Sequence, residues 1–223
     1  MILHTTYFGS VDWYAQIVRS QEPVTIDGKE RFVKQTERNH CLIATANGVQ
    51  KLTVPVTLPS GGKTPICDVR ISDHGNWRHL HWQALSSAYG MSPFFDYYAD
   101  DIRPFFERKW EYLFDYNYEI AQKMMELVNP NDHANPSTAS LPGEGMTSRA
   151  ESYAPFNPIY FPSLGSGAGD GVSPYYQTFQ RRHGFLPGMS ILDLLFNMGP
   201  EALLVLRNVG NRLTGNANSQ SFF

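Results

Sequence analysis

The sequence is poor in cysteine, with only Cys41 and Cys67 among its 223 residues. Two thiols cannot complete a four-ligand zinc site by themselves, and we interpret both as core thiols of a reduced protein. A surplus of charge is also missing, because the formal net charge is -3 and acidic and basic residues are interspersed. Such a chain has no field that would hold a polyanion, so we expect no nucleic acid partner.

Long apolar runs are absent as well. No window approaches the roughly 20 apolar residues that a membrane-spanning helix needs, and the N-terminus lacks the basic region of a signal peptide. We therefore expect a cytoplasmic protein that does not insert into a membrane. Local signatures of nucleophilic catalysis are missing too, since there is no serine elbow, no Cys-His signature and no carboxylate dyad.

The chain does contain enough apolar sequence, 42% of its residues, for one substantial hydrophobic core. Residues 2–8 and 24–27 are typical of short strands, and the stretch between them predicts a capped helix. Strand, helix and strand indicate a crossover with parallel pairing. A site would then lie at the carboxyl ends of these strands, where His4, Tyr7 and Asp27 could converge.

A β-hairpin is predicted next. The runs at residues 41–45 and 50–56 flank Asn47-Gly48, which is the strongest short-range hairpin signal. Residues 66–71 alternate apolar with polar side chains, as a half-buried strand should. A helix should follow from the N-cap Asn76 to about Tyr89.

The second half of the chain predicts a helical layer and one long irregular segment. Aromatic residues recur with helical spacing over residues 93–128, with a break or restart at Pro104. Residues 129–187 are rich in glycine, proline and serine, which indicates a disordered excursion, a lid over a site, or an arm that reaches a partner chain and would allow a homodimer. Residues 188–223 should form a helical segment on the core.

The expected fold class is thus α/β. It combines a mixed sheet that has a parallel βαβ opening and a β-hairpin with a C-terminal helical layer. We divide the chain into a core domain at residues 1–128, an irregular arm or lid at 129–187, and a helical segment at 188–223.

Three histidines and two tryptophans lie within residues 71–95. His79 and His81 are two residues apart on a helix, so they cannot chelate one metal ion as an i, i+4 pair does, and we predict no metal site. Trp77 and His81 are four apart, so packing should fix the imidazole and leave one ring nitrogen for a partner. His81 is therefore the candidate catalytic residue. The alternative is that this helix is simply a packed core helix.

A polar cluster precedes the hairpin and comprises Lys34, Gln35, Arg38 and Asn39. Arg38 could hold a carboxylate or phosphate with two hydrogen bonds. The alternative is an exposed turn with ordinary charges. Arg70 and Arg78 flank the turn before the predicted helix, and with the helix N-terminus they could cradle an anion.

Several motifs resemble those of the WbqC-like proteins, which are found among bacterial surface-polysaccharide genes. They are TTYFGSVDWYAQI, KQTERNHCLI, NGVQKLTVPV, residues 77–89 followed by SPFF, and FLPGMSILDLLFNMGPEAL. The resemblance highlights Tyr7, Gln35, Arg38, Asn39, Thr53, Trp77, His81 and Asp193. One departure is that the family often begins with Gln-Pro where this chain has His4-Thr5. The resemblance implies no established reaction, and the opening also looks like the nucleotide-binding sheets of adenylyl- and cytidylyl-transferring enzymes at the level of the fold.

From the polar cluster together with the setting that the resemblance implies, we predict a small-molecule transferase linked to surface polysaccharide or amino-sugar metabolism, and we assign no cofactor. His81 would act as general base on an anionic or sugar-nucleotide substrate. The predicted substrate-binding residues are Tyr7, Lys34, Gln35, Arg38, Asn39 and Arg78. The alternative function is that of a non-catalytic binding or assembly protein, which would use its aromatic surface and the long arm.

Overall fold

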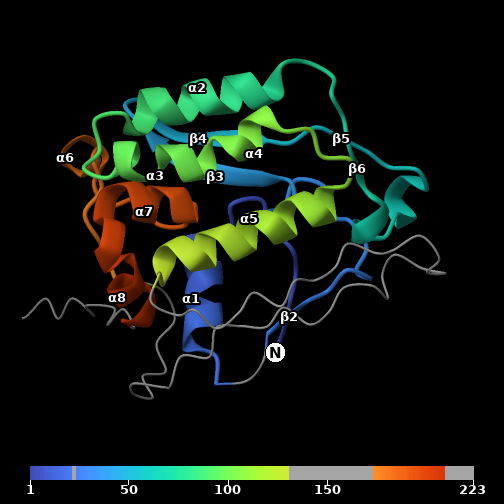
Figure 1. Ribbon diagram of the computed structural model, residues 1–223, viewed down its shortest axis with the longest axis horizontal. Coiled ribbons are helices and arrows are strands. Elements are labelled where there is room, and N and C mark those ends of the chain that lie inside the picture. Colours follow the sequence, from blue (N-terminus) through green and yellow to red (C-terminus); the bar gives the residue numbers. More distant parts are fainter. Residues whose placement is uncertain (22–23, 131–172, 209–223) are drawn as a thin grey trace, which may run out of the picture.

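The computed structural model describes residues 1–21, 24–130 and 173–208 (Figure 1). Helices and strands are mixed in the first half of the chain and helices dominate the second, which confirms the α/β class. The described strands pair as three two-stranded sheets. Most of them are only two residues long, too short for a continuous ladder. Residues 131–172, most of the predicted arm or lid, lie outside the described residues. Within the described ranges, no helix has the length and apolar content that crossing a membrane requires.

The N-terminal segment forms β1 (Ile2–Leu3), α1 (Val11–Arg19) and β2 (Thr25–Ile26). β1 and β2 pair in parallel, which confirms the predicted crossover. The Ser10 side chain caps α1 by accepting a hydrogen bond from the Trp13 backbone N–H. β1 is shorter than predicted because the chain soon leaves the strand direction. The Tyr7 N–H donates instead to the Glu37 carbonyl in the loop before the hairpin.

β3 (His40–Thr45) and β4 (Gly48–Thr53) form the predicted hairpin. Its turn lies one residue earlier than predicted, at Ala46-Asn47, since Thr45 pairs with Gly48. Gly48 has a φ of +103°, which a glycine adopts without steric cost. The glycine is therefore the first residue of the return strand and not part of the turn.

The hairpin has a core face and a solvent face, because side chains alternate along each strand. The buried core face carries Cys41, Ile43 and Leu52. The solvent face carries His40, Lys51 and Thr53, of which His40 is half-buried and the others are exposed. Cys41 and Cys67 are both buried and form no disulfide, which agrees with their prediction as core thiols, and burial raises the pKa of Cys41.

The strand predicted at residues 66–71 was mostly wrong. Ile66–Asp68 forms a 3₁₀ turn (η2), and only Arg70–Ile71 (β6) pairs, with Val56–Thr57 (β5). Ile66 and Val69 are both fully buried. They are three residues apart, which is the period of a 3₁₀ turn, so both reach the core without an extended strand.

The central helices are α2 (Trp77–Tyr89), α3 (Phe95–Ile102), α4 (Pro104–Glu107) and α5 (Leu113–Val128). Pro104 is the first residue of α4, which confirms the predicted restart. α2 lies beside β3 and β4 in Figure 1 and contacts β3. It buries Trp77 and His81, whereas Leu80 on the same helix is exposed.

The C-terminal elements are α6 (Gln180–His183), α7 (Ile191–Met198), η4 (Gly199–Glu201) and α8 (Ala202–Arg207). A fully buried carboxylate, Asp193 on α7, connects three segments. It accepts hydrogen bonds from the hydroxyls of Tyr89 on α2 (2.8 Å) and Tyr175 (2.7 Å), and from the Gln177 amide (2.8 Å). These bonds explain how residues 175–177, inside the predicted arm, are held on the core.

Candidate functional site

The predicted site residues fall mainly into two places on either side of β4. We call the first the inner cluster, made of Tyr7, Trp77, Arg78, His81 and Tyr116. We call the second the outer hollow, lined by Phe32, Lys34, Gln35, Asn39, His40, Lys51, Thr53 and Val56. His81 is not among the residues that line the hollow.

In the inner cluster, His81 is held by protein groups. Its Nδ1 lies 2.9 Å from the Tyr7 hydroxyl, and the ring also bonds with the Thr53 backbone. The edge contact with Trp77, at 5.2 Å between ring centroids, confirms the packing predicted from their spacing. The imidazole is 6% exposed, so it is fixed within the core.

Burial also decides the protonation of this cluster. Desolvation lowers the pKa of His81 to about 4, and the bond with Thr53 opposes that shift only in part. Burial likewise raises the pKa of Tyr7 well above its ordinary value. At neutral pH the imidazole is neutral and the phenol protonated. The bond with Thr53 raises the pKa of His81, as donation to a carbonyl does, so the single ring N–H is used there and Nδ1 accepts the hydrogen bond that Tyr7 donates.

Arg78 borders the inner cluster from the first turn of α2. Its guanidinium stacks on the Trp77 ring at 4.5 Å, and its charge lowers the pKa of Tyr7 against the larger effect of burial. Its Nη1 donates to Asp73 at 2.6 Å, whereas its Nε and Nη2 are buried with no acceptor among the described residues. Arg78 is therefore close to Tyr7 and His81.

The anion site predicted at the turn before α2 is occupied by carboxylates of the chain itself. Asp73 lies between Arg78 and Lys109, whose hydrogen bonds lower its pKa. Arg70 pairs with Glu111 at 2.5 Å. The two arginines thus bind carboxylates of the chain itself.

The outer hollow lies on the solvent face of the hairpin, at its open end. His40 faces Thr53 directly across the two strands, and Lys51 is two residues from Thr53 on the same face. The loop that contains Lys34 and Gln35 adds a second wall, and the cavity has a volume of about 220 Å³. Three predicted binding residues, Lys34, Gln35 and Asn39, are brought together here.

The hollow combines apolar side chains, Phe32 and Val56, with basic and polar ones. Two lysines line it, and no aspartate or glutamate of the described ranges does. The Asn39 side chain is 8% exposed; its Nδ2 donates to the Val54 carbonyl, whereas its Oδ1 is buried and meets no donor among the described residues. Gln35 has a φ of +60°, a left-handed conformation that costs a non-glycine residue roughly 1 kcal/mol or more and is frequent at ligand sites.

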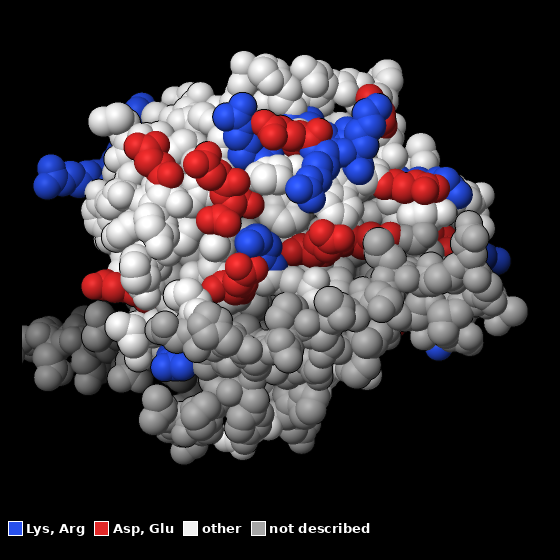
Figure 2. Space-filling model, in the orientation of Figure 1, with Lys and Arg blue, Asp and Glu red and all other residues white. Residues whose placement is uncertain are grey.

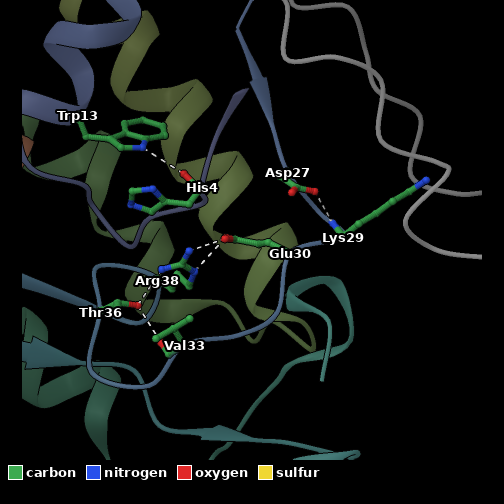
Figure 3. Close-up of polar contacts among 8 residues, drawn as sticks. All are labelled: His4, Trp13, Asp27, Lys29, Glu30, Val33, Thr36 and Arg38. Carbon is green, nitrogen blue, oxygen red and sulfur yellow. Dashed lines mark hydrogen bonds and ion pairs between the residues drawn. The ribbon is translucent and has the colours of Figure 1, made fainter. Parts of the chain in front are cut away.

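Arg38 lies outside the hollow. Its Nε (2.9 Å) and Nη2 both donate to the Glu30 carboxylate, and its Nη1 donates to Thr36 (3.2 Å; Figure 3). The predicted two-bond recognition of a carboxylate therefore occurs within the chain. Arg38 shapes the loop that borders the hollow rather than facing it.

The convergence predicted at the ends of the first two strands does not occur. Tyr7 turns into the inner cluster, while the Asp27 carboxylate accepts from the Lys29 backbone N–H and lies apart from His4 (Figure 3). His4 contributes its carbonyl to the Trp13 indole N–H. The two-residue strands are too short to bring these three side chains to one point.

Sequence reasoning missed His40 and Lys51, and found Thr53 only through the family resemblance. The signal was present in the hairpin itself, because its register predicts which side chains share a face. Because the turn was predicted one residue too late, at Asn47-Gly48, the predicted register did not pair His40 with Thr53. No cluster of three or more metal-ligating side chains occurs in the part of the chain that the structure describes.

The match to a known protein family includes the residues of both the inner cluster and the outer hollow. The sequence profile of the WbqC-like protein family matches residues 5–141. Uncharacterized protein Rv1507c from Mycobacterium tuberculosis (strain ATCC 25618 / H37Rv) is 26% identical over 215 residues, which cover 87% of this chain and 91% of that protein. No solved structure matches the chain at a significant level.

Proposed function

This chain belongs to the WbqC-like protein family, and from that premise we propose that it is a small-molecule transferase that acts on an anionic sugar metabolite. The pathway we propose is surface polysaccharide or amino-sugar metabolism, because the resemblance is to proteins found among bacterial surface-polysaccharide genes. The observation that carries the proposal is the outer hollow, where Lys34, Gln35 and Asn39 meet Lys51 around one cavity.

The lining of the hollow favours a ligand with two kinds of group. The lysines favour an acid group, because no carboxylate among the lining residues neutralises them. The Gln35 amide and the Thr53 hydroxyl, which also line the hollow, favour hydroxyl or amine groups that can exchange hydrogen bonds with them. A sugar phosphate or a sugar acid has both groups.

The size of the hollow narrows the choice further. Its volume of about 220 Å³ is below the range of roughly 300–1,000 Å³ that is typical of sites enclosing drug-sized ligands. One sugar ring with its acid group fits that space. A sugar nucleotide would enter with one end only.

His81 acts in this proposal through Thr53, the residue that the inner cluster and the hollow share. The imidazole bonds with the Thr53 backbone, while Thr53 lines the hollow. The general-base role predicted for His81 would require β4 to move away and expose the ring to substrate. We therefore propose His81 as a positioning residue, which holds the end of β4 in place.

Calorimetric titration tests the site. Glucose 1-phosphate and glucuronate should bind, and uncharged glucose should bind at least about tenfold more weakly, because one charged hydrogen bond contributes roughly 1.5–3 kcal/mol. Lys34→Met should weaken the binding of both acids about fivefold, in line with roughly 1 kcal/mol for an exposed charge.

The matched control is Lys29→Met, which removes an exposed lysine outside the hollow. It should leave both affinities unchanged. Equal binding of glucose and of the two acids would contradict the role of the lysines. Failure of all three sugars to bind would contradict the hollow as a sugar site.

A second candidate, the binding or assembly protein, is favoured by exposed apolar side chains. Met91, between α2 and α3, is 92% exposed, and Tyr97 on α3 is 72% exposed. Side chains of this kind are typical of interface centres. If they form an interface, light scattering should show a dimer that dissociates in a Met91→Glu, Tyr97→Glu double variant. A monomer at all concentrations would rule out self-assembly.

A further inference from the structure

Among the described residues that line the outer hollow, His40 is the one with an imidazole. It begins β3 and faces Thr53 across the strand pair. Lys51 is its diagonal neighbour on the same face, at a separation of about 7 Å that long side chains span. An anion held in the hollow by the lysines would therefore contact this imidazole as well.

We propose that His40 is a ligand-contact residue of the outer hollow and that it couples the binding of a small oxyanion to the uptake of a proton. The inference rests on the proposed function in using the same hollow. A protonated His40 adds a third positive charge beside Lys34 and Lys51, and both of its ring nitrogens become donors. Phosphate, sulfate and carboxylate groups share the chemistry that this arrangement recognises.

Charged groups reach His40 from the facing strand and the preceding loop. Burial and then Lys51 on β4 lower the pKa of His40, whereas Glu37 in the loop raises it. Lys34 lies across the hollow. A bound oxyanion would favour the imidazolium and raise the pKa again. By linkage, the affinity for the oxyanion rises as the pH falls.

Sulfate is the probe of choice, because it stays a dianion from about pH 8 to about pH 5 and any change in affinity then reports the protein. Side-chain NMR of the full-length chain would follow the His40 imidazole, which a His40→Gln variant identifies by its missing signal. We expect saturating sulfate to raise the pKa of His40 by about one pH unit. The affinity for sulfate should correspondingly increase about tenfold between about pH 8 and about pH 5.

Three variants separate His40 from the lysines. His40→Gln should bind sulfate within about twofold of the wild type near pH 8 and lose the tenfold gain at low pH. Lys34→Met should bind about fivefold more weakly at every pH and keep the gain. His79→Gln removes an exposed imidazole outside the hollow and should change neither property.

The outcomes distinguish this inference from the proposed function. If sulfate binds but His40→Gln keeps the tenfold gain, or the His40 signal ignores sulfate, the inference is overturned and the anion site remains. If sulfate binds at no pH, both are overturned. Where sulfate does bind, titrations of His40→Gln with glucose 1-phosphate and with glucuronate show whether the binding of a phosphoryl group or that of a carboxylate is weakened by loss of the imidazole.

Discussion

Two histidines lie on different sides of one β-hairpin and have different surroundings. His81 on α2 is in the core, with Tyr7 on one ring nitrogen and a bond to the Thr53 backbone. His40 on β3 faces a basic hollow and is half-buried. Burial lowers the pKa of both, but for His40 the positive charge of Lys51 adds to the shift. The comparison teaches that protein partners surround one imidazole and fix it in the core, while the other borders an open hollow.

Removing the two side chains should give the largest difference. His81→Ala leaves a cavity in the inner cluster and deprives Tyr7 of its partner, so we expect the free energy of unfolding to fall by about 3 kcal/mol. His40→Ala should cost less than about 0.5 kcal/mol, since its side chain is half-buried on the solvent face. Urea unfolding measures both values. Equal losses would contradict the assignment of His81 to the core.

The pH dependence of stability should also separate the histidines. The pKa of His81 in the folded state, about 4, is below its unfolded value of about 6.5, so the unfolded chain takes up the proton first. Its contribution to stability is therefore complete above about pH 6.5 and decreases as the pH falls to about 4, by about 3 kcal/mol.

Asp115 should instead increase the stability of the folded chain as the pH falls through this range, because its pKa in the folded state is raised to about 7. The quantity to measure is therefore the difference in unfolding free energy between the wild type and His81→Gln, which leaves Asp115 in place. That difference should shrink as the pH falls from about 6.5 to about 4. A constant difference would refute the depressed pKa of His81.

A smaller loss is expected from Tyr7→Phe, which removes only the hydroxyl that bonds with His81 Nδ1. A buried ring nitrogen without its donor should cost about 1–2 kcal/mol of unfolding free energy. Tyr97→Phe makes the same chemical change at an exposed position and should cost less than about 0.5 kcal/mol. Thermal or urea unfolding compares the pair, and similar values would mean that the Tyr7–His81 bond contributes nothing.

The smallest effect on stability, within about 0.5 kcal/mol, is expected for Lys51→Met, because this side chain is exposed. The substitution should nevertheless raise the pKa of His40, since it removes a neighbouring positive charge, and leave that of His81 unchanged. NMR titration of both imidazoles reads out the two values. Parallel shifts would show that the histidines share one environment.

Much of the local structure could be predicted because its signals are local. The cap at Ser10, the helix start at Pro104 and the Asn-Gly hairpin signal each depend on a few adjacent residues. The spacing of Trp77 and His81 was enough to predict their contact. The hairpin turn was predicted one residue too late because a glycine with positive φ, here Gly48, can lie either within a turn or directly after it.

The candidate site could be predicted only in part. The polar run before the hairpin indicated Lys34, Gln35 and Asn39, which do share a hollow. Arg38 belongs to the same polar run and could equally bind an anion, but its guanidinium is bound by Glu30. Whether an arginine meets a ligand or a carboxylate of its own chain depends on where the chain brings that carboxylate.

The sequence by itself determined the α/β class, the parallel opening, the hairpin and the order of the helices, because hydrophobic period, caps and turn residues act over short distances. Only the tertiary structure decided which histidine belongs to the core. Tyr7 and His81 are 74 positions apart, and their pKa values follow from desolvation that exists only once the strands and α2 are packed together. The register of the folded hairpin likewise placed His40, Lys51 and Thr53 on one face, where a ligand can reach them.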